Sequence, residues 1–523
     1  MMSLPLQISL RGLARRGSML RFWALLILLV AAKPALTFAV TCSPPPAIDP
    51  TRGFVANFNN PCYALPLATV SGAQESGDLN AIYDKVYFQV APGYELVFLG
   101  VFPNSRFLLA TVYDDHLVTV GNVPDFAMVP LASSMSNPFL TGATFKPNQS
   151  YGFKVTFGGG PPVNVSPGCS TASTNIDQNV MDASQIHQGL NWTGYPNLPP
   201  GFPPHETGAN AAGVVLVRKY ADIDSPPINE EVIVRSLANG CAIPIAQAIQ
   251  SNIISTTQTL TSSWLHQTQV SAHAQFSGAI EPWECFPPDS QNHVIWMRTA
   301  DYVTFENTYE AYLRAVLSAA QVQTLLSGQA YLRVQFQAPS TPNTPCTNGS
   351  CSLTGNEQAR YTSFSIQAPA INLGGPVTLY SIYDRNFVKD PNGNVTLVIG
   401  FGAPQPANVT AANYYTWVDA STIPNISTLN QVRVRDLLPN QSFACSTFNV
   451  PYRTTEYNPE GGYLGNYVPT VDFPTAAQLP PVATPILRPN TCYIVPTETP
   501  QVCSPNVTGS SPARGIPASL KAE

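Results

Sequence analysis

Two stretches of the sequence carry the clearest signal of the fold: Tyr151–Ser166 (YGFKVTFGGGPPVNVS) and Val395–Thr410 (VTLVIGFGAPQPANVT). They align without a gap, and Phe, Gly, Pro, Asn, Val and a hydroxyl residue coincide in the second part of each. In the first part, side chains two apart would share one face of a strand. Gly158 and Gly402 would then let the chain turn out of the sheet, and the prolines that follow would stop further pairing. Each stretch therefore predicts a strand whose matched alternate residues bury the same face, each in its own sandwich, followed by a turn.

Other short blocks recur in the same order along the two parts of the chain, and this predicts an internal repeat. The matched blocks are Cys62-Tyr63 with Cys285-Phe286, Arg106-Phe107 with Arg360-Tyr361, Trp192 with Trp417, and Val217-Arg218 with Val434-Arg435. The repeat divides the chain into a signal peptide (1–39), a first β-sandwich domain (40–240), a linker or helix (241–264), a second β-sandwich domain (265–470) and a Pro-rich tail (471–523). The alternative is that similar strand–turn sequences arose independently.

Composition also favours β structure. Of 523 residues, 44% are hydrophobic and only 11% are charged, well below the roughly 25% of average soluble proteins. Short runs rich in β-branched and aromatic residues, bounded by Pro, Gly or Asn, predict strands: Val86–Val90, Leu96–Val101, Arg106–Tyr113, Tyr151–Phe157, Tyr331–Gln337, Arg360–Ile366 and Asn394–Phe401. We therefore predict a mainly β fold of two similar antiparallel β-sandwich (jelly-roll-like) domains in tandem. One or two short helices are expected within Asn307–Leu326 and Ile243–Trp264.

The N-terminus predicts secretion. Arginines precede the apolar run Phe22–Ala32, and Thr37 and Ala39 offer small residues for cleavage before Val40. A signal anchor is the alternative, but this run would rise only about 16 Å as a helix, against a bilayer core of roughly 30 Å. No transmembrane segment is expected in the mature chain. The net charge of −6 and the lack of a basic stripe argue against a nucleic-acid partner.

Cysteines and sequons indicate an extracellular, disulfide-bonded glycoprotein. An even count of ten in a secreted chain predicts five disulfides: Cys42, Cys62, Cys169, Cys241, Cys285, Cys346, Cys351, Cys445, Cys492 and Cys503. Local pairs are expected at Cys346–Cys351 and Cys492–Cys503, Cys42–Cys62 is plausible, and the other four cannot be paired from the sequence. The expected N-glycosylation sites are Asn148, Asn164, Asn191, Asn348, Asn394, Asn408, Asn425, Asn440 and Asn506.

The chain resembles a loosely defined family of secreted all-β proteins of unknown function from bacteria and eukaryotic microbes. The resembling residues are Arg106–Asp115, Asn137–Phe139, Arg360–Ile366, Tyr383-Asp384 before the Asp390–Asn394 hairpin, Pro406–Asn408, Trp417 and Arg433–Pro439. The resemblance covers most of the mature chain and implies no particular activity. The Asn307–Leu326 segment departs from the family pattern.

No catalytic motif is present, since the chain lacks a G-x-S-x-G elbow and an H-E-x-x-H zinc helix. No catalytic residue and no cofactor are therefore predicted, with calcium as the one alternative. Candidate metal ligands are Asp114, Asp115, His116, Asp222 and Asp224, although a solvated strand end and a solvated acidic loop are the favoured interpretations. Candidate aromatic platforms for a sugar are Trp192, Tyr195, Tyr414, Tyr415 and Trp417, although such residues commonly pack in a core.

Two functions of different classes follow. The first is a non-catalytic extracellular or cell-surface protein with a binding or structural role toward glycans or other matrix polymers. The second is an extracellular hydrolase of polysaccharide or ester with its site between the two domains. Convergence of polar side chains in an interdomain groove would favour the hydrolase, and an exposed aromatic strip without them would favour binding.

Overall fold

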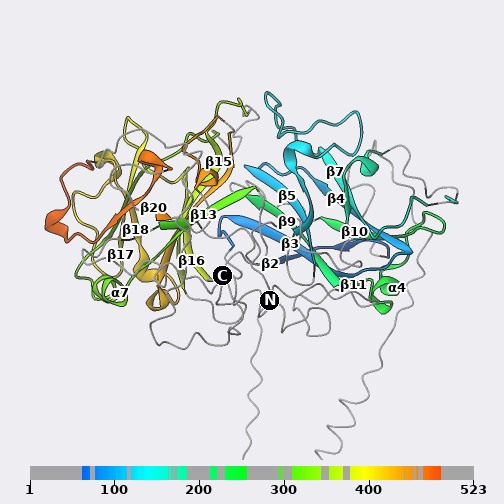
Figure 1. The fold of residues 1–523 in the computed structure, drawn as a ribbon, viewed down its shortest axis with the longest axis horizontal. Coiled ribbons are helices and arrows are strands. Elements are labelled where there is room, and N and C mark those ends of the chain that lie inside the picture. The colour runs from blue at the N-terminus through cyan, green and yellow to red at the C-terminus, as the bar shows by residue number, and fades with distance from the viewer. Residues whose placement is uncertain are drawn as a thin grey trace, which may run out of the picture. The chain divides into compact units, whose positions relative to one another are not determined.

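The computed structural model describes residues 62–70, 77–114, 119–162, 164–166, 169, 174–184, 212–220, 230–255, 294, 296–298, 309–342, 353–368, 377–440, 442–450, 455–456 and 463–484. We call residues 62–255 the first half and residues 294–484 the second half. Both halves are mainly β, as the composition predicts (Figure 1). The α-helices in the described residues are α4 (Ile245–Gln250) and α7 (Ala319–Leu326).

The first half contains two sheets. Sheet 1 has the order β1-β10-β4-β7-β8, with strands Leu65–Pro66, Glu231–Ser236, Tyr94–Val101, Ser150–Thr156 and Val180–Asp182. Sheet 2 has the order β11-β3-β9-β5-β6, with strands Ile254–Ser255, Ala81–Gln89, Ala212–Tyr220, Phe107–Asp114 and Thr119–Pro124, and β2 (Ala68–Val70) also pairs with β3. Alternate residues of both sheets form one core, in which Phe98 and Phe153 stack at 4.7 Å between ring centroids. The first half is therefore a β-sandwich.

The second half also contains two sheets. Sheet 3 has the order β16-β15-β19-β13-β12-β20, with strands Val377–Tyr383, Ala359–Ala368, Gln431–Pro439, Glu310–Val316, Trp296–Arg298 and Thr455–Glu456. Sheet 4 has the order β18-β17-β14-β21, with strands Thr416–Asp419, Asn394–Gly400, Leu332–Gln337 and Thr470–Asp472. Leu313, Val434 and Leu397 belong to the core between them. This half is also a β-sandwich.

The two halves share their strand order. The path β10-β4-β7-β8 of sheet 1 corresponds to β21-β14-β17-β18 of sheet 4, and β3-β9-β5-β6 of sheet 2 corresponds to β13-β19-β15-β16 of sheet 3. All pairs are antiparallel except β7–β8 and β17–β18, which are parallel and occupy corresponding places. The predicted turn glycines Gly158 and Gly402 follow β7 and β17, both with positive φ, of 77° and 114°.

The predicted helix over Asn307–Leu326 is correct only in its last part. Glu310–Val316 is strand β13, in which Ala311, Leu313 and Ala315 are fully buried at every second position. The apolar residues of this segment satisfy both a helical and a strand spacing, and pairing with β19 and β12 selects the strand. Helix α7 then begins after Ser318, whose hydroxyl oxygen accepts a hydrogen bond from the Gln321 backbone nitrogen.

The helix predicted within Ile243–Trp264 is confirmed in a shorter form, as α4. Strand β11 follows it in the expected linker 241–264 and pairs with β3 of the first half. Strand β21 spans the expected start of the Pro-rich tail, and Leu479 and Ala483 beyond it pack on the outer face of sheet 4. The predicted signal peptide lies outside the described residues. Within the described residues, no helix is long and apolar enough to cross a membrane.

Candidate functional site

The inner sheets of the two halves, sheets 2 and 3, contact each other through a tyrosine-rich layer. Its buried members come from both halves: Ala81, Tyr83, Tyr87, Phe107, Leu109, Tyr113, Val214, Leu216, Tyr220, Tyr361, Tyr383 and Leu437. The rings of Tyr220 and Tyr361 meet across the junction at 5.6 Å between centroids. The place where the sequence predicts an interdomain groove is therefore a packed interface in the described residues.

Reciprocal ion pairs connect the two halves. Arg106 Nη1 lies 2.8 Å from Asp384 Oδ2, and Arg360 Nη1 lies 2.9 Å from Asp125 Oδ2. The ladders place these residues at matching positions. Each arginine directly precedes Phe107 or Tyr361, which start corresponding stretches of β5 and β15, and each aspartate directly follows the end of β6 or β16.

The surrounding hydrogen bonds repeat this reciprocity. The backbone nitrogen of Leu108 donates to Asp125 Oδ2 at 3.0 Å, and that of Thr362 donates to Asp384 Oδ1 at 3.3 Å. Burial raises the pKa of Asp125 to about 6, although Arg360 and the backbone donors oppose this effect. Each aspartate thus binds the backbone of a strand in its own half and receives an arginine from the other half.

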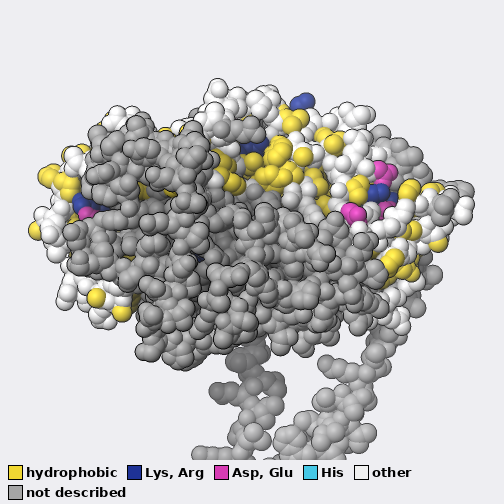
Figure 2. Space-filling model, viewed as in Figure 1, with side chains coloured by type: hydrophobic (Ala, Val, Ile, Leu, Met, Phe, Trp, Pro, Cys, Tyr) yellow, Lys and Arg dark blue, Asp and Glu magenta, His cyan; other side chains and the backbone are white. Residues whose placement is uncertain are grey.

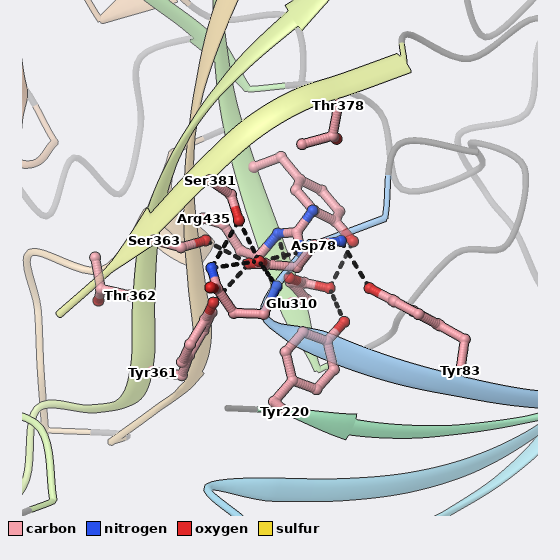
Figure 3. A network of polar contacts seen from close by, with 12 residues as sticks. Asp78, Tyr83, Tyr220, Glu310, Tyr361, Thr362, Ser363, Thr378, Ser381 and Arg435 are labelled. Carbon is pink, nitrogen blue, oxygen red and sulfur yellow. Dashed lines mark hydrogen bonds and ion pairs between the residues drawn. The ribbon is translucent and has the colours of Figure 1, made fainter. Parts of the chain in front are cut away.

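A second polar cluster lies in the middle of the interface and is asymmetric. Arg435 on β19 places Nε 2.6 Å from Glu310 Oε1 and Nη1 3.1 Å from Asp78 Oδ2. Figure 3 shows both carboxylates beside the guanidinium group. Asp78 belongs to the first half, so this ion pair also crosses the interface. All three side chains are about 1% exposed, so the cluster is shielded from water.

Hydroxyl groups from both halves complete this cluster. Tyr361, Ser363 and Ser381 donate to the Asp78 carboxylate at 2.6–2.7 Å. Tyr220 from the first half donates to Glu310 Oε2 at 3.0 Å, and Figure 3 shows its hydroxyl pointing toward that carboxylate. The carboxylates therefore have several donors each, as buried charges require.

The electrostatics of the cluster favour fixed charges over proton transfer. Burial raises the pKa of Asp78, but the Arg435 charge and the serine hydroxyls outweigh it and hold this pKa below its ordinary value. Burial and the neighbouring carboxylates hold the pKa values of Tyr220 and Tyr361 well above the ordinary value. At neutral pH, Asp78 and Arg435 are therefore ionised, and Tyr220 and Tyr361 are neutral. This arrangement can join the two halves.

The predicted aromatic platform is only partly accessible. Tyr415 is 1% exposed and its hydroxyl donates to the Pro480 carbonyl oxygen at 2.8 Å, so its assignment as an exposed platform is wrong. The cause is the chain after β21, which covers this face of sheet 4. Tyr414 and Trp417 are half-buried at the edge of the same cluster. Trp192 and Tyr195 lie outside the described residues.

Tyr414 and Trp417 are nevertheless held in specific conformations. Tyr414 has φ 61° and ψ 31°, in the left-handed region that bulky residues rarely adopt. The Trp417 indole rests on Gly400, where an added Cβ would lie 2.4 Å from Trp417 Cη2. The same indole packs edge-on against Tyr331 at 6.0 Å. Strained, well-packed aromatic residues at a surface are candidates for ligand contact.

The candidate metal ligands are not brought together in the described residues. Asp114 is fully buried at the end of β5, and Asp115, His116, Asp222 and Asp224 lie outside the described part of the chain. Within that part, no group of three or more His, Cys, Asp or Glu side chains could hold a metal ion.

The sequons differ in accessibility. Asn148, Asn164 and Asn425 are exposed, Asn408 and Asn440 are half-buried, and Asn394 is buried. The Nδ2 atom of Asn394, to which a glycan would be attached, donates to Asp390 Oδ2 at 2.8 Å. Asn191, Asn348 and Asn506 lie outside the described residues.

One disulfide is described in full, and it joins cysteines that the sequence could not pair. Cys169 and Cys241 are bonded across 72 residues of sequence. Cys62 and Cys445 are also disulfide-bonded, and no described cysteine is free. The expected local pairs at Cys346–Cys351 and Cys492–Cys503 fall outside the described residues.

The central interface residues were missed by sequence reasoning, although a signal was present. Strand β19 reads Val432-Arg433-Val434-Arg435, with charges at every second position in a chain of which only 11% is charged. Alternating arginines within an otherwise apolar strand indicate a second, polar face that must also be paired. The partners Asp78 and Glu310 could not be identified, because they are remote in sequence from that strand.

Comparison with known proteins adds no function. No family model and no curated protein match this chain. It is similar to the crystal structure of an uncharacterized protein from Burkholderia cenocepacia, with 10% identity, a TM-score of 0.38, and coverage of 81% of this chain and 84% of the other. It is also similar to the VPA0106 protein from Vibrio parahaemolyticus, with 10% identity, a TM-score of 0.33, and coverage of 72% and 89%.

Proposed function

We propose that this protein is a secreted, N-glycosylated, disulfide-bonded extracellular protein that binds a polymer such as a neutral glycan without catalysing a reaction. The observation that carries the proposal is the filled interface between sheets 2 and 3. A hydrolase with its site between the halves needs a cleft there, whereas the described side chains are buried and bonded to one another.

Several features support the extracellular part of the proposal. The N-terminal arrangement of arginines, apolar residues and small residues is typical of a secretory signal peptide. The Cys169–Cys241 disulfide fits an oxidising compartment, and Asn148, Asn164 and Asn425 are exposed sequons.

We also infer that the two halves are an internal repeat. Their corresponding strand orders, the corresponding parallel strands and the reciprocal Arg–Asp pairs support this inference. In this arrangement the buried interface keeps the two sandwiches in one orientation, so that their outer surfaces are presented together to an extended ligand. Preorganisation of this kind favours binding because less freedom is lost on association.

The described surface favours an uncharged ligand. Figure 2 shows few charged side chains among hydrophobic and neutral ones on the described part of the visible face. The low charged fraction of the whole chain is consistent with this. We place the glycan contact at Tyr414 and Trp417, because aromatic rings offer large, rigid contact areas with a polar edge.

The test uses the purified, secreted full-length protein and a panel of neutral and charged extracellular polysaccharides. Co-sedimentation and calorimetry should show binding to a neutral polymer, with no release of reducing ends or acids. Tyr414→Ala should weaken binding about tenfold or more, since truncating an aromatic hot spot costs above roughly 1–2 kcal/mol. Val180→Ser, at an exposed site on sheet 1, serves as the control. Turnover of a polymer or ester, or the absence of binding to every polymer, would overturn the proposal.

A further inference from the structure

A second buried polar cluster lies inside the first half, between sheets 1 and 2. Asp84 projects from β3 and Lys219 from β9, and both side chains are 0% exposed. Glu230, directly before β10, and Tyr151 on β7 face them from sheet 1 and are equally buried. The cluster is surrounded by the main apolar core of this half, which includes Val86 and Val217 from the same strands.

The geometry places the lysine amine against two carboxyl groups at once. Lys219 Nζ lies 2.7 Å from Asp84 Oδ2 and 2.9 Å from Glu230 Oε2. Thr69 donates to the other oxygen of Asp84 at 2.5 Å, and Tyr151 donates to Glu230 Oε1. In the β3–β9 ladder, Lys219 is opposite Ile82 and Asp84 is opposite Val217, so their side chains are diagonal neighbours on one face.

The sequence leaves room for this arrangement at one specific glycine. A Cβ at Gly100 would lie 2.7 Å from the Tyr151 hydroxyl oxygen and 3.1 Å from Glu230 Cγ. Any larger residue at position 100 would push these side chains away from Lys219. Glycine within strand β4 is otherwise unfavourable, so its presence indicates that close approach is needed there.

The charges of the cluster do not balance when every group is ionised, since one ammonium faces two carboxylates. Burial, and then the neighbouring charge of Asp84, raise the pKa of Glu230 against the influence of Lys219. This direction favours the protonated form of Glu230 beside the Lys219–Asp84 ion pair. The geometry thus holds a carboxyl group that can exchange a proton next to an amine and a second carboxyl group, and all three side chains are buried.

We propose that Lys219 and Asp84 form an intramolecular amide (isopeptide) bond, with Glu230 as the proton-transfer group. The ammonium of Lys219 gives a proton to the Asp84 carboxylate, which produces an amine and a neutral carboxylic acid. Nζ attacks Asp84 Cγ as Glu230 gives its proton to the carbonyl oxygen, and the Glu230 carboxylate then takes a proton from the attacking nitrogen. One C–O bond breaks, its hydroxyl leaves as water with the proton of the other hydroxyl, and Glu230 ends the reaction protonated.

The surroundings favour both the rate and the direction of this step. The reacting groups are in contact, and fixing reactants in this way gives effective concentrations of about 10⁵ M or more. The product replaces a buried ion pair by a neutral amide, which removes two charges from an apolar interior. Because both reacting side chains are 0% exposed, bulk water has little access to the amide once the released water molecule has left the site.

Lys154 offers a matched contrast in the same half. Its Nζ lies 2.6 Å from Asp177 and 3.5 Å from Glu95, so it also faces two carboxylates. The Asp177 side chain, however, is 55% exposed. Water therefore stabilises the ionised groups, and no amide is expected at Lys154.

The test is peptide mapping of the reduced, secreted full-length protein by mass spectrometry. An acylated lysine resists trypsin, so the amide predicts a branched peptide of residues 53–85 joined to 219–235, lighter than their sum by one water molecule. Lys154 should remain free in the same digest. Separate peptides with an unmodified Lys219 in the wild-type protein would overturn the proposal, whatever the variants do.

Variants then assign the roles of the groups. Lys219→Arg keeps the charge but should abolish the branched peptide. Glu230→Gln should slow its formation about 100-fold or more, since a positioned acid or base contributes that much. Asp84→Asn should form the same product with loss of ammonia, so its branched peptide should have the same mass as that of the wild type. A branched peptide that still contains residues 53–85 in Lys219→Arg would assign the bond to another lysine and contradict the proposal.

Discussion

The first and second halves have the same order of strands but distribute their charges differently. In the first half, a lysine and two carboxyl groups lie inside the sandwich, at Lys219, Asp84 and Glu230. The ladder positions that correspond to Lys219 and Asp84 in the second half are Asp436 and Leu313. The backbone arrangement therefore does not depend on which polar groups the sandwich encloses.

At the interface between the halves, by contrast, one set of charged residues does correspond between the two halves. In the pairs Arg106–Asp384 and Arg360–Asp125, each half contributes one arginine and one aspartate. Each aspartate also accepts a hydrogen bond from a backbone nitrogen of its own half. Around Arg435, by contrast, the corresponding position to Ser363 is Leu109. The reciprocal pairs therefore define how the two halves pack. The cluster around Arg435 is an addition that has no equivalent on the other side of the interface, so it makes the interface asymmetric.

The largest expected effect follows from removing the cation of the central cluster. Arg435→Met would leave Asp78 and Glu310 buried with no guanidinium between them. Removing one partner of a buried pair costs about 3–5 kcal/mol, so the free energy of unfolding measured in urea should fall by that amount. Val398→Ala, in the outer face of sheet 4, controls for general loss of packing. A loss below about 1 kcal/mol for Arg435→Met would mean that the cluster does not hold the halves together.

The two reciprocal pairs should lose different amounts of stability when their aspartates are replaced. Asp384→Asn should cost about 2–3 kcal/mol, because it removes the carboxylate charge that pairs with Arg106, whose side chain is 2% exposed. Asp125→Asn should cost less at pH 7, because Arg360 is 14% exposed and water partly solvates it. Urea unfolding of both variants measures the difference. A larger loss for Asp125→Asn would reverse the assigned order.

The Asp125→Asn variant should also change how the stability of the folded protein depends on pH. Burial raises its folded-state pKa from 3.8 to about 6, so the folded protein binds this proton more tightly than the unfolded chain. The stability that this proton contributes is fully present below about pH 4 and is lost as pH rises through about 6. Asparagine does not titrate, so Asp125→Asn should flatten the stability profile of the wild type between these values by about 2–3 kcal/mol.

Local sequence patterns predict the strands well but not the interface. The runs around Phe153 and Leu397 have one apolar face and clear turn signals, so both strands and their buried faces could be identified. The segment that contains Leu313 satisfies two periodicities, and only pairing with β19 decides between them. The pairing of Arg435 with Asp78 depends on tertiary packing of residues far apart in sequence, for which a single sequence carries no local signal.

The smallest expected effect concerns Asn164 and Asn408, which occupy matching positions of the opening motif. The sequence predicts that both are exposed; Asn164 is, whereas Asn408 is half-buried and its Nδ2 donates to the Leu479 and Pro480 carbonyl oxygens at 3.2 and 2.7 Å. A glycan at Asn408 would break these bonds, so glycopeptide analysis should find a glycan at Asn164 and not at Asn408.

The same two positions should differ in stability. Asn408→Ala should destabilise the folded protein by about 1 kcal/mol through lost hydrogen bonds, while Asn164→Gln should change the free energy of unfolding by less than about 0.5 kcal/mol. A fully glycosylated Asn408 would show that residues 479–480 do not cover this site in the purified protein, and would make the two halves more alike at this turn.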